Sequence, residues 1–439
     1  MESPGSHAIA APKYRWDGAV LWGALGLLMF AVLAFGATEA WSIFVVRAGA
    51  VMLLLVWAVG RAAGGGEQRI AVPHIFYPAA LFMALVAAQW AGLSAYRYAT
   101  MVEGMNYIAY GILMLLAVQC VHGEEDARRV VLAFAIFGGV LAFVSVMQGL
   151  SGSVKLLFLR TPRVAAVGYG YGPYVNHNHY AGMMEMVAPF LIVLAASDRP
   201  AGAQRAFTAF AALLAAGSIV LSRSRGGILA FALEAVFLAA FLLPASAGRR
   251  TRQIGALAAV VLLAFLLWLG GGPILERVGS IGDIAANQMR IDITGDSLRM
   301  FAQRPVLGWG VGTFPVVYPT QRSFFSDFFV NEAHNDYAQL LVEAGLAGFV
   351  AMLWYLVVLF RQGLPKITAP PLRSWSAIVT LAALTGVAGL LVHSFFDFNL
   401  HVPANAALFF FLGGIAAAEM RGENKQPARR PRESSARVN

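Results

Sequence analysis

Twelve apolar stretches, each long enough to cross a bilayer, constrain the fold of this chain more than any other feature. A helix needs about 20 mostly apolar residues to span a hydrocarbon core of roughly 30 Å. Only 13% of the residues are charged, whereas soluble domains average about a quarter. The sequence therefore predicts an all-α polytopic membrane protein. The predicted crossings are 18–36, 43–60, 74–92, 101–120, 129–148, 179–197, 205–221, 227–244, 254–270, 338–360, 375–393 and 402–420.

The even number of crossings predicts that both termini lie on one side of the membrane. Every loop on that side carries Lys or Arg, and the tail is basic, so the positive-inside rule makes this side cytoplasmic. We expect a cytoplasmic segment at 1–17, a membrane domain at 18–420 and a disordered tail at 421–439. Between the ninth and tenth crossings, 271–337 is expected to form a large outer loop. The net charge of +9 follows from this topology and does not indicate nucleic-acid binding.

Arginines gather on the predicted outer side, where the positive-inside rule does not explain them. Arg223 and Arg225 in "SRSRGG" have almost no loop between two crossings, so Arg225 must face protein or a water-filled cleft. Arg163 and Arg290 lie in the two long outer segments. Guanidinium groups bind phosphate through two hydrogen bonds and keep their charge. The cluster predicts a site for a pyrophosphate headgroup, although a single outer arginine such as Arg322 can also contact lipid phosphate.

Two polar motifs precede crossings on the same side. "VNHNHY" supplies Asn176, Asn178 and His179, whose side chains both donate and accept hydrogen bonds and so suit sugar hydroxyls. For His177, in the same motif, a purely structural role as a helix cap is as good an interpretation as sugar binding. "NEAHNDY" supplies His334, whose neutral imidazole can take a proton from a hydroxyl nucleophile. Its neighbours Asn335 and Asp336 are candidate helix caps, a role compatible with binding. Residues His177, His179, His334 and Asp336 also admit a metal interpretation, but their spacing matches no closed zinc motif and we expect no metal or cofactor.

Other polar residues have less specific interpretations. His393, Asp397 and His401 lie between the last two crossings and face the same side as the arginines. Glu103, Glu185 and Glu234 lie in apolar stretches, where they can line an ion path or pair with the outer arginines; we favour pairing.

The large outer loop holds two further features. "GDSLRMFAQR" predicts a short amphipathic helix, with Asp296 near its start and Pro305 at its end. "PVLGWGVGTFP" predicts a glycine-rich turn, and because no strand precedes it we do not interpret it as a nucleotide loop.

Four motifs in order resemble one family of membrane enzymes. "VNHNHYAGMMEMVAPF", "SRSRGGILAF", "RIDITGDSLRMFAQRPVLGWGVGTF" and "NEAHNDYAQLLVEAGLAG" are similar to the core of the O-antigen ligase and O-antigen polymerase superfamily of bacterial inner-membrane glycosyltransferases. The resemblance covers roughly residues 160–350. It implies a GT-C-like fold and transfer of a glycan from undecaprenyl pyrophosphate to an acceptor sugar hydroxyl at the periplasmic face, without metal or nucleotide sugar. The acceptor is then another glycan or lipid A core.

The resemblance also implies roles for individual residues. Arg225, Arg290 and His334 match the family's catalytic positions, and Arg163 matches a further arginine. The arginines would stabilise the leaving pyrophosphate and His334 would activate the acceptor, with Asn335 or Asp336 setting its tautomer. Direct attack predicts inversion at the anomeric carbon. Two alternatives stay open: a transporter, for example of inorganic carbon, and a non-catalytic partner of an exopolysaccharide assembly machine.

Overall fold

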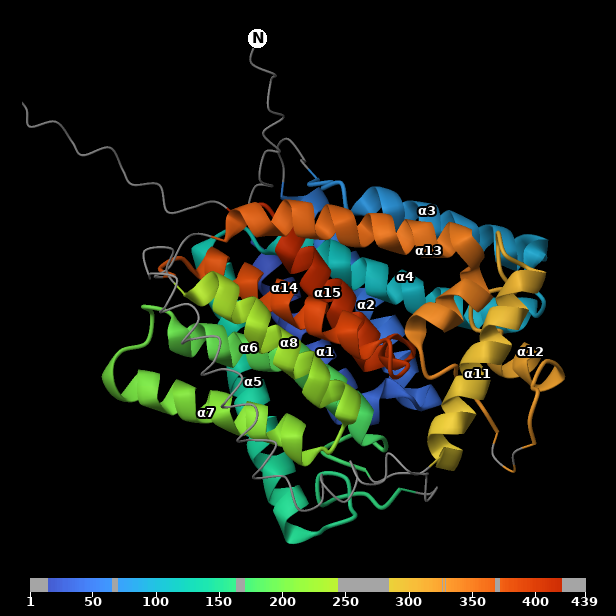
Figure 1. Cartoon of the computed structure of the whole chain (residues 1–439). Coiled ribbons are helices and arrows are strands. Elements are labelled where there is room, and N and C mark those ends of the chain that lie inside the picture. Colours follow the sequence, from blue (N-terminus) through green and yellow to red (C-terminus); the bar gives the residue numbers. More distant parts are fainter. Residues whose placement is uncertain are drawn as a thin grey trace, which may run out of the picture.

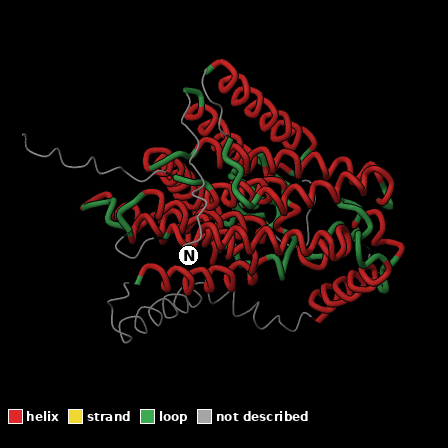
Figure 2. The backbone as a smooth tube through the Cα atoms, turned by 90° about the horizontal axis from the view of Figure 1, so that it is seen from above, coloured by secondary structure: helices red, strands yellow, loops and turns green. Residues whose placement is uncertain are grey.

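The protein is helical throughout the part of the chain that is described. A computed structural model describes residues 15–64, 70–162, 170–243, 284–325, 327, 329–367 and 372–420. Figure 2 shows helices and connecting loops over these ranges, and no strand among them. The α-helices are α1 (Asp17–Leu33), α2 (Ala40–Ala63), α3 (Phe76–Ala88), α4 (Arg97–Cys120), α5 (Glu124–Ser151), α6 (His177–Ala196), α7 (Gly202–Leu221), α8 (Arg225–Leu242), α11 (Ile284–Gln303), α12 (Phe314–Val317), α13 (Asp336–Gly363), α14 (Trp375–His393) and α15 (Pro403–Ala417). Short helical turns are η1 (Phe35–Ala37), η2 (Gln89–Leu93), η4 (Tyr318–Thr320), η5 (Leu364–Lys366) and η6 (Asn399–His401).

The chain is a multi-pass membrane protein, as its apolar stretches predict. Within the described ranges, 9 helices are long and apolar enough to cross a membrane, and α1 and α15 are shorter apolar helices. These helices coincide with all the predicted crossings except 254–270, which lies outside the described residues, as do 1–14 and the tail 421–439. The all-α polytopic fold class is therefore confirmed.

Helices α6, α14 and α15 form the centre of the bundle (Figure 1). Most residues of α6 and α14 are buried, whereas α2 is largely exposed, as expected for a helix that faces lipid. Small residues allow the central helices to approach closely. A Cβ on Gly386 of α14, for example, would lie only 2.7 Å from the Met186 Cα of α6. The central pair is therefore held at a separation that only glycine permits at this point.

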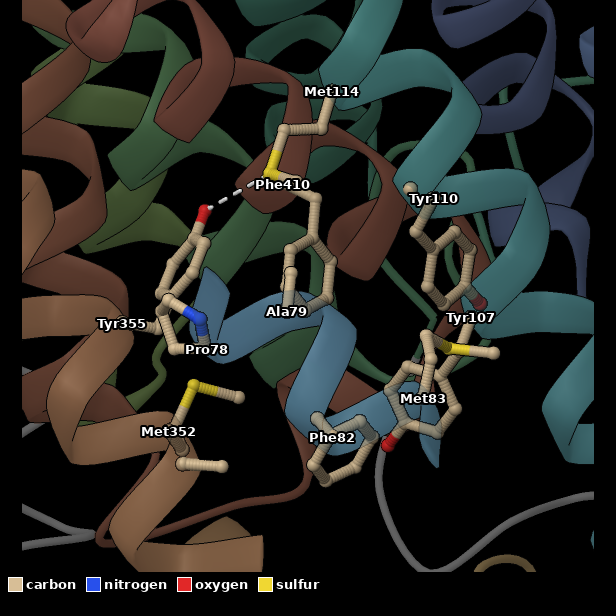
Figure 3. A pocket seen from close by; sticks show the side chains of 12 residues that line it. Pro78, Ala79, Phe82, Met83, Tyr107, Tyr110, Met114, Met352, Tyr355 and Phe410 are labelled. Atoms are coloured by element: carbon tan, nitrogen blue, oxygen red, sulfur yellow. Dashed lines mark hydrogen bonds between the residues drawn. The ribbon is translucent and has the colours of Figure 1, made fainter. Parts of the chain in front are cut away.

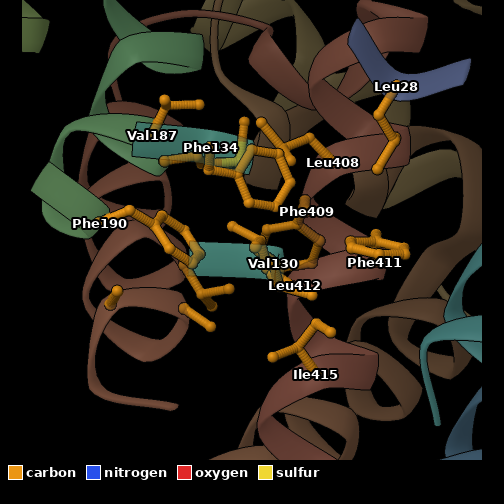
Figure 4. Close-up of a cluster of buried hydrophobic side chains, with 14 of the residues drawn as sticks. Leu28, Val130, Phe134, Val187, Phe190, Leu408, Phe409, Phe411, Leu412 and Ile415 are labelled. Atoms are coloured by element: carbon orange, nitrogen blue, oxygen red, sulfur yellow. The ribbon is translucent and has the colours of Figure 1, made fainter. Parts of the chain in front are cut away.

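Aromatic side chains fill the space between α5, α6 and α15 (Figure 4). Phe134 of α5 packs on Phe190 of α6 with ring centroids 4.9 Å apart, and Phe411 of α15 meets Phe134 edge to face. Phe134, Phe190 and Phe411 are all buried. Such offset and edge-to-face pairs add about 0.5–1.5 kcal/mol each beyond the burial of their area.

A glycine-rich loop docks into a break in α13. Gly345 has φ +63° and ψ −165°, so the helical hydrogen-bond pattern is interrupted there. Residues 305–310 supply the missing partners: Trp309 N donates to Val342 O (2.9 Å) and Gly310 N to Glu343 O (2.9 Å), while Leu346 N donates to Pro305 O (2.8 Å). Interrupted backbone is tolerated at membrane depth only where protein or water satisfies it. The turn predicted in "PVLGWGVGTFP" thus completes a broken helix.

Helix α11 is longer than predicted and differs at its start. It begins at Ile284, so Asp296 lies in its interior and cannot act on the N-terminal dipole. The Asp296 carboxylate is buried instead, where it accepts hydrogen bonds from Tyr318 Oη (3.0 Å) and Ser323 N (3.1 Å). The helix packs on α13 at one end of the bundle, steeply across the bundle direction (Figure 1). Its polar sequence suits a helix that lies outside the hydrocarbon core.

We expect Gly345→Ala to destabilise the protein by about 2 kcal/mol or more, because the residue has a left-handed φ and a Cβ would lie 2.4 Å from the Val306 carbonyl oxygen. Gly217→Ala in α7 is the matched control, since a Cβ there meets nothing within 4 Å. Thermal unfolding of the detergent-purified variants measures both effects. A Gly345→Ala midpoint equal to that of Gly217→Ala would contradict the role of the break.

Candidate functional site

The turn between α14 and α15, residues 394–401, brings the polar residues of the chain together. Asp397 in this turn is fully buried, and three side chains from two other elements face its carboxylate. Asn178 Nδ2 donates to Asp397 Oδ2 at 2.5 Å, His334 Nδ1 lies 3.3 Å from Oδ1, and His179 Nε2 lies 3.8 Å from the same oxygen. The predicted residues of "VNHNHY" and "NEAHNDY" therefore meet on one carboxylate.

Asp397 is held as a carboxylate by its neighbours. Burial alone would raise its pKa, but the imidazoles of His179 and His334 beside the carboxylate hold the pKa well below its usual range. Its own backbone neighbour, Phe398 N, adds a hydrogen bond of 2.9 Å to Oδ1. A neutral His334 that donates from Nδ1 to this carboxylate presents Nε2 as a proton acceptor. The His334 side chain is 25% exposed.

The two imidazoles are fixed by packing as well as by hydrogen bonds. The Phe398 ring packs edge to face against both imidazoles, with its centroid 4.6 Å from that of His179 and 5.0 Å from that of His334. His334 itself has φ +52°, a left-handed conformation that is costly for a residue with a Cβ. Strain of this kind persists where surrounding contacts enforce it.

Asn335 caps α13, as predicted. Its Oδ1 accepts hydrogen bonds from Tyr337 N and Ala338 N, both at 3.0 Å, and its Nδ2 donates to Phe395 O at 3.2 Å. Asp336 is buried, and protein groups occupy both its oxygens: Ser394 Oγ donates to Oδ2 (2.7 Å) and His401 Nδ1 lies 2.9 Å from Oδ1. These contacts attach the start of α13 to both ends of the turn. The carboxylate that lies within hydrogen-bond distance of His334 Nδ1 belongs to Asp397.

A second group of carboxylates, from Asp336 and Glu343, lies close to the His401 imidazole at the other end of the turn. Burial would lower the pKa of His401, but the carboxylates of Asp336, 2.9 Å from Nδ1, and Glu343, 3.9 Å from Nε2, raise it well above the usual value. Glu343 also accepts hydrogen bonds from Gly312 N (2.9 Å) and Phe314 N (3.0 Å), which connects the glycine-rich loop to the site. No group of three or more His, Cys, Asp and Glu side chains in the described residues is arranged to hold a metal ion.

Two of the predicted arginines approach the same turn. Arg290 of α11 donates to Phe396 O at 3.1 Å, one residue before Asp397. Arg225 is the exposed first residue of α8, and the next residue, Gly226, lies so close to the turn that a Cβ there would be 3.1 Å from Phe396 Cβ. Arg223 is also exposed, with φ +60°. Arg163 lies outside the described residues.

Three helices, α6, α8 and α13, have their N-terminal ends next to this turn. Helix α6 contacts it through Asn178 and Asp397, α8 through Gly226 and Phe396, and α13 through a hydrogen bond from Asp336 N to Ser394 O (2.9 Å). Helix N-termini carry partial positive charge and favour anions. The cap of α6 is Asn176, whose Oδ1 accepts from Asn178 N (2.9 Å) and whose Nδ2 lies 3.5 Å from His179 Nε2. "VNHNHY" therefore serves both as a helix cap and as part of the site.

The intramembrane glutamates do not pair with the outer arginines as we expected. Glu185 of α6 pairs with His393 of α14, at 2.9 Å between Oε1 and Nδ1. Glu103 accepts a hydrogen bond from Asn106 Nδ2 (2.9 Å). Glu234 is buried against Gly389, and neither of its oxygens has a hydrogen-bond partner among the described groups. His393 is the better partner for Glu185 because it lies on the adjacent central helix.

One apolar hollow lies away from this chemistry. It has a volume of about 50 Å³ and opens between α3, α4, α13 and α15 (Figure 3). Phe82, Tyr107, Met352 and Tyr355 are among its lining side chains. None of the predicted site residues lines it, so it is not the centre of the polar site.

Sequence reasoning noted Asp397 and His401 but assigned them no role. Their positions between the last two crossings, on the same side as the arginines, were the available signal. Their partners are far away in sequence: His334 precedes Asp397 by 63 residues and Asn178 precedes it by 219. Only the three-dimensional arrangement shows that one buried carboxylate joins the two motifs.

Comparisons with known proteins agree with the motifs. Residues 210–353 match the family model described as O-antigen ligase. The matched segment includes Arg225, Arg290 and His334 but neither His179 nor Asp397. No curated protein matched the chain. The resemblance recognised in the sequence is thus confirmed over this segment, and it supports a glycosyltransferase of the O-antigen ligase and polymerase type.

Glu332, two residues before His334, gives the site a testable pH dependence. Burial raises its pKa to about 7, against about 4.3 for an unperturbed glutamate. Because the folded state holds this proton more tightly, its stabilising contribution is complete below about pH 4 and is lost as the pH rises through about 7. Glu332→Gln keeps an acceptor for Gln339 Nε2 but cannot ionise. We expect it to raise the thermal midpoint at pH 8 more than at pH 5.

The control is Glu125→Gln, which changes a half-exposed carboxylate on α5. Thermal midpoints of the three proteins at pH 5 and pH 8 measure the difference. An equal shift for Glu332→Gln at both pH values would contradict the assignment.

Proposed function

We propose that this protein, whose residues 210–353 match the family model described as O-antigen ligase, transfers a glycan from undecaprenyl pyrophosphate to an acceptor sugar hydroxyl. The reaction takes place at the outer, periplasmic face of the bacterial inner membrane, with both chain termini in the cytoplasm and a GT-C-like arrangement of helices. The acceptor is another glycan repeat or lipid A core. No metal ion and no nucleotide sugar take part.

The observation that carries the proposal is the meeting of a proton acceptor and an anion-binding group on two adjacent residues. Asp397 faces His334, and the carbonyl oxygen of Phe396 accepts from Arg290. A glycosyl transfer needs both groups within the length of one sugar, because the nucleophile and the leaving group lie on opposite sides of the anomeric carbon. The N-termini of α6, α8 and α13 add positive potential at the same place.

The arginines act on the leaving group. As the bond between the anomeric carbon and the pyrophosphate oxygen breaks, its electron pair passes to that oxygen. Arg225 and Arg290 bind the pyrophosphate of the donor and stabilise this charge, which is larger in the transition state than in the bound donor. Arg223 and Arg163 are proposed to hold the pyrophosphate and the nearby sugar. Fixed guanidinium groups thus supply the charge stabilisation that other transferases obtain from a metal.

His334 acts on the acceptor. Its Nε2 takes the hydroxyl proton while the acceptor oxygen forms the new bond to the anomeric carbon. The Asp397 carboxylate holds the Nδ1–H tautomer and stabilises the imidazolium that results. Attack from the side opposite the leaving group inverts the configuration. Asn335 and Asp336 position His334 by fixing the start of α13 on the turn.

Asn176, Asn178 and His179 are proposed to bind sugar hydroxyls at the mouth of the site. Asn176 and Asn178 are partly exposed at the start of α6. Their amides donate and accept, as does a histidine, so each can bind a hydroxyl in either role. Asn178 also contacts Asp397, and this contact links sugar binding to the group that orients His334.

Transfer by purified protein from a synthetic undecaprenyl-pyrophosphate glycan tests the mechanism. We expect His334→Ala and Asp397→Asn to lower kcat about 10²–10⁴-fold, because the proton acceptor is lost or misoriented. Arg225→Ala should lower it by about 10²-fold or more. Arg373→Ala is the control, since its side chain is 79% exposed and pairs with Asp198, away from the assigned residues. EDTA should leave the wild-type rate unchanged.

The product mass distinguishes a lengthened glycan from a glycan on lipid A core. Wild-type rates in folded His334→Ala and Arg225→Ala proteins would show that the assigned site is wrong. Absence of transfer by the wild type with several acceptors, together with solute uptake in liposomes, would indicate a transporter.

A further inference from the structure

A buried ionisable pair at the start of α8 has no role in the proposed glycosyl transfer. Glu185 of α6 and His393 of α14 are both almost fully buried, with His393 Nδ1 2.9 Å from Glu185 Oε1 and 3.2 Å from Oε2. An ionisable pair on membrane-spanning helices is costly unless its partners satisfy it. The carboxylate holds the imidazole with Nδ1 toward α6, so that Nε2 points the other way.

The Nε2 atom of His393 meets the residue that starts α8. It lies 3.4 Å from Ser224 Oγ, a fully buried hydroxyl. Ser224 Oγ also caps α8 by accepting from Gly227 N at 3.1 Å. If His393 donates its Nδ1–H to Glu185, the Ser224 hydroxyl can donate to Nε2 and accept from Gly227 N. Both nitrogens of His393 and the Ser224 hydroxyl then have hydrogen-bond partners. Arg225 follows Ser224 directly.

Close packing fixes the same helix start. A Cβ on Gly226 would lie 2.9 Å from His393 Cδ2, and a Cβ on Gly227 would lie 3.0 Å from Glu185 Oε1. The two glycines of "SRSRGG" therefore let the backbone rest directly on the buried pair. The backbone of Arg225 has little freedom to move relative to His393, although its side chain is exposed.

His393 also anchors the other half of the site through its backbone. Its carbonyl oxygen accepts from Phe396 N (2.8 Å) and Asp397 N (3.2 Å). Phe396 O binds Arg290, and Asp397 binds His334. One residue thus fixes the distance between the arginine that starts α8 and the turn that carries the carboxylate.

We propose that His393, paired with Glu185 and bonded to Ser224, is a positioning residue that places Arg225 for binding of the lipid pyrophosphate donor. This inference rests on the proposed function, because it assigns Arg225 to the donor. It predicts that a change in the pair weakens donor binding selectively. A structural role alone would reduce the amount of active protein and leave the KM values unchanged.

The test is the KM for the donor and for the acceptor in Ser224→Ala and His393→Gln proteins. Ser224→Ala removes the hydroxyl with little change in volume, whereas His393→Gln loses simultaneous contact with Glu185 and Ser224. We expect each to raise the donor KM about tenfold, because a displacement of about 1 Å is enough to weaken positioned contacts strongly. The acceptor KM should stay within about twofold of wild type in this interpretation.

Ser374→Ala is the matched control. Ser374 caps the other end of α14 by accepting from Ala377 N at 3.0 Å, so the same kind of contact is lost far from Arg225. Unchanged donor KM in both folded test variants, or an equal rise in Ser374→Ala, would overturn the inference while the proposed function stands. A wild-type protein with no transfer activity would instead reject the proposed function and the inference with it.

Discussion

The buried carboxylate of Asp397 is the interaction on which the arrangement of the site depends. A fully buried carboxylate is stable only if polar or charged groups surround it, and here Asn178 and His334 hydrogen-bond to it while His179 lies 3.8 Å away. These donors come from the starts of α6 and α13, so the charge determines how closely the two helices meet. The same requirement orients both imidazoles around Phe398. Satisfying one buried charge thus assembles residues that are far apart in sequence.

The break in α13 connects this centre to the polar segment outside the bundle. Glu343, at the break, accepts from the backbone of the glycine-rich loop and lies 3.9 Å from His401 Nε2. Gln89 joins the same junction by donating to the carbonyl oxygens of Leu307 and Glu343. Helix α11, which carries Arg290, leads into this loop and also packs directly on α13. The position of Arg290 therefore depends in part on backbone hydrogen bonds at the break in α13.

Local sequence properties predicted the helices and the caps but not the long-range pairs. Apolar length is sufficient to predict a crossing, and an Asn followed by a helical pattern is sufficient to predict the cap at Asn335. The cap of α6 is Asn176, whereas the sequence suggested His177 for that role. The break at Gly345 was not predicted, because "EAGLAG" has the composition of a continuous helix. The start of α11 at Ile284 was missed because its first turns have no strong apolar periodicity.

The pairing of Glu185 with His393 is another long-range contact that local sequence did not predict. The two residues are 208 positions apart, and each has several possible partners on the basis of charge alone. The arginines were a reasonable choice for Glu185, since both lie toward one end of the bundle. Packing of α6 against α14 brings the imidazole closer. Resemblance to the family motifs predicted Arg225, Arg290 and His334, and the structure adds the Asp397 carboxylate beside His334 and the Phe396 carbonyl oxygen that accepts from Arg290.

Equilibrium binding of a short polyprenyl pyrophosphate, compared with the matching monophosphate, tests the central claim most directly. The account places pyrophosphate on the arginines and the acceptor proton on His334. It therefore predicts that Arg225→Ala and Arg290→Ala each weaken pyrophosphate binding about tenfold or more, because each removes a charge-assisted contact. His334→Ala should bind as wild type does. Undiminished binding in both arginine variants, or loss of binding in His334→Ala alone, would contradict the account.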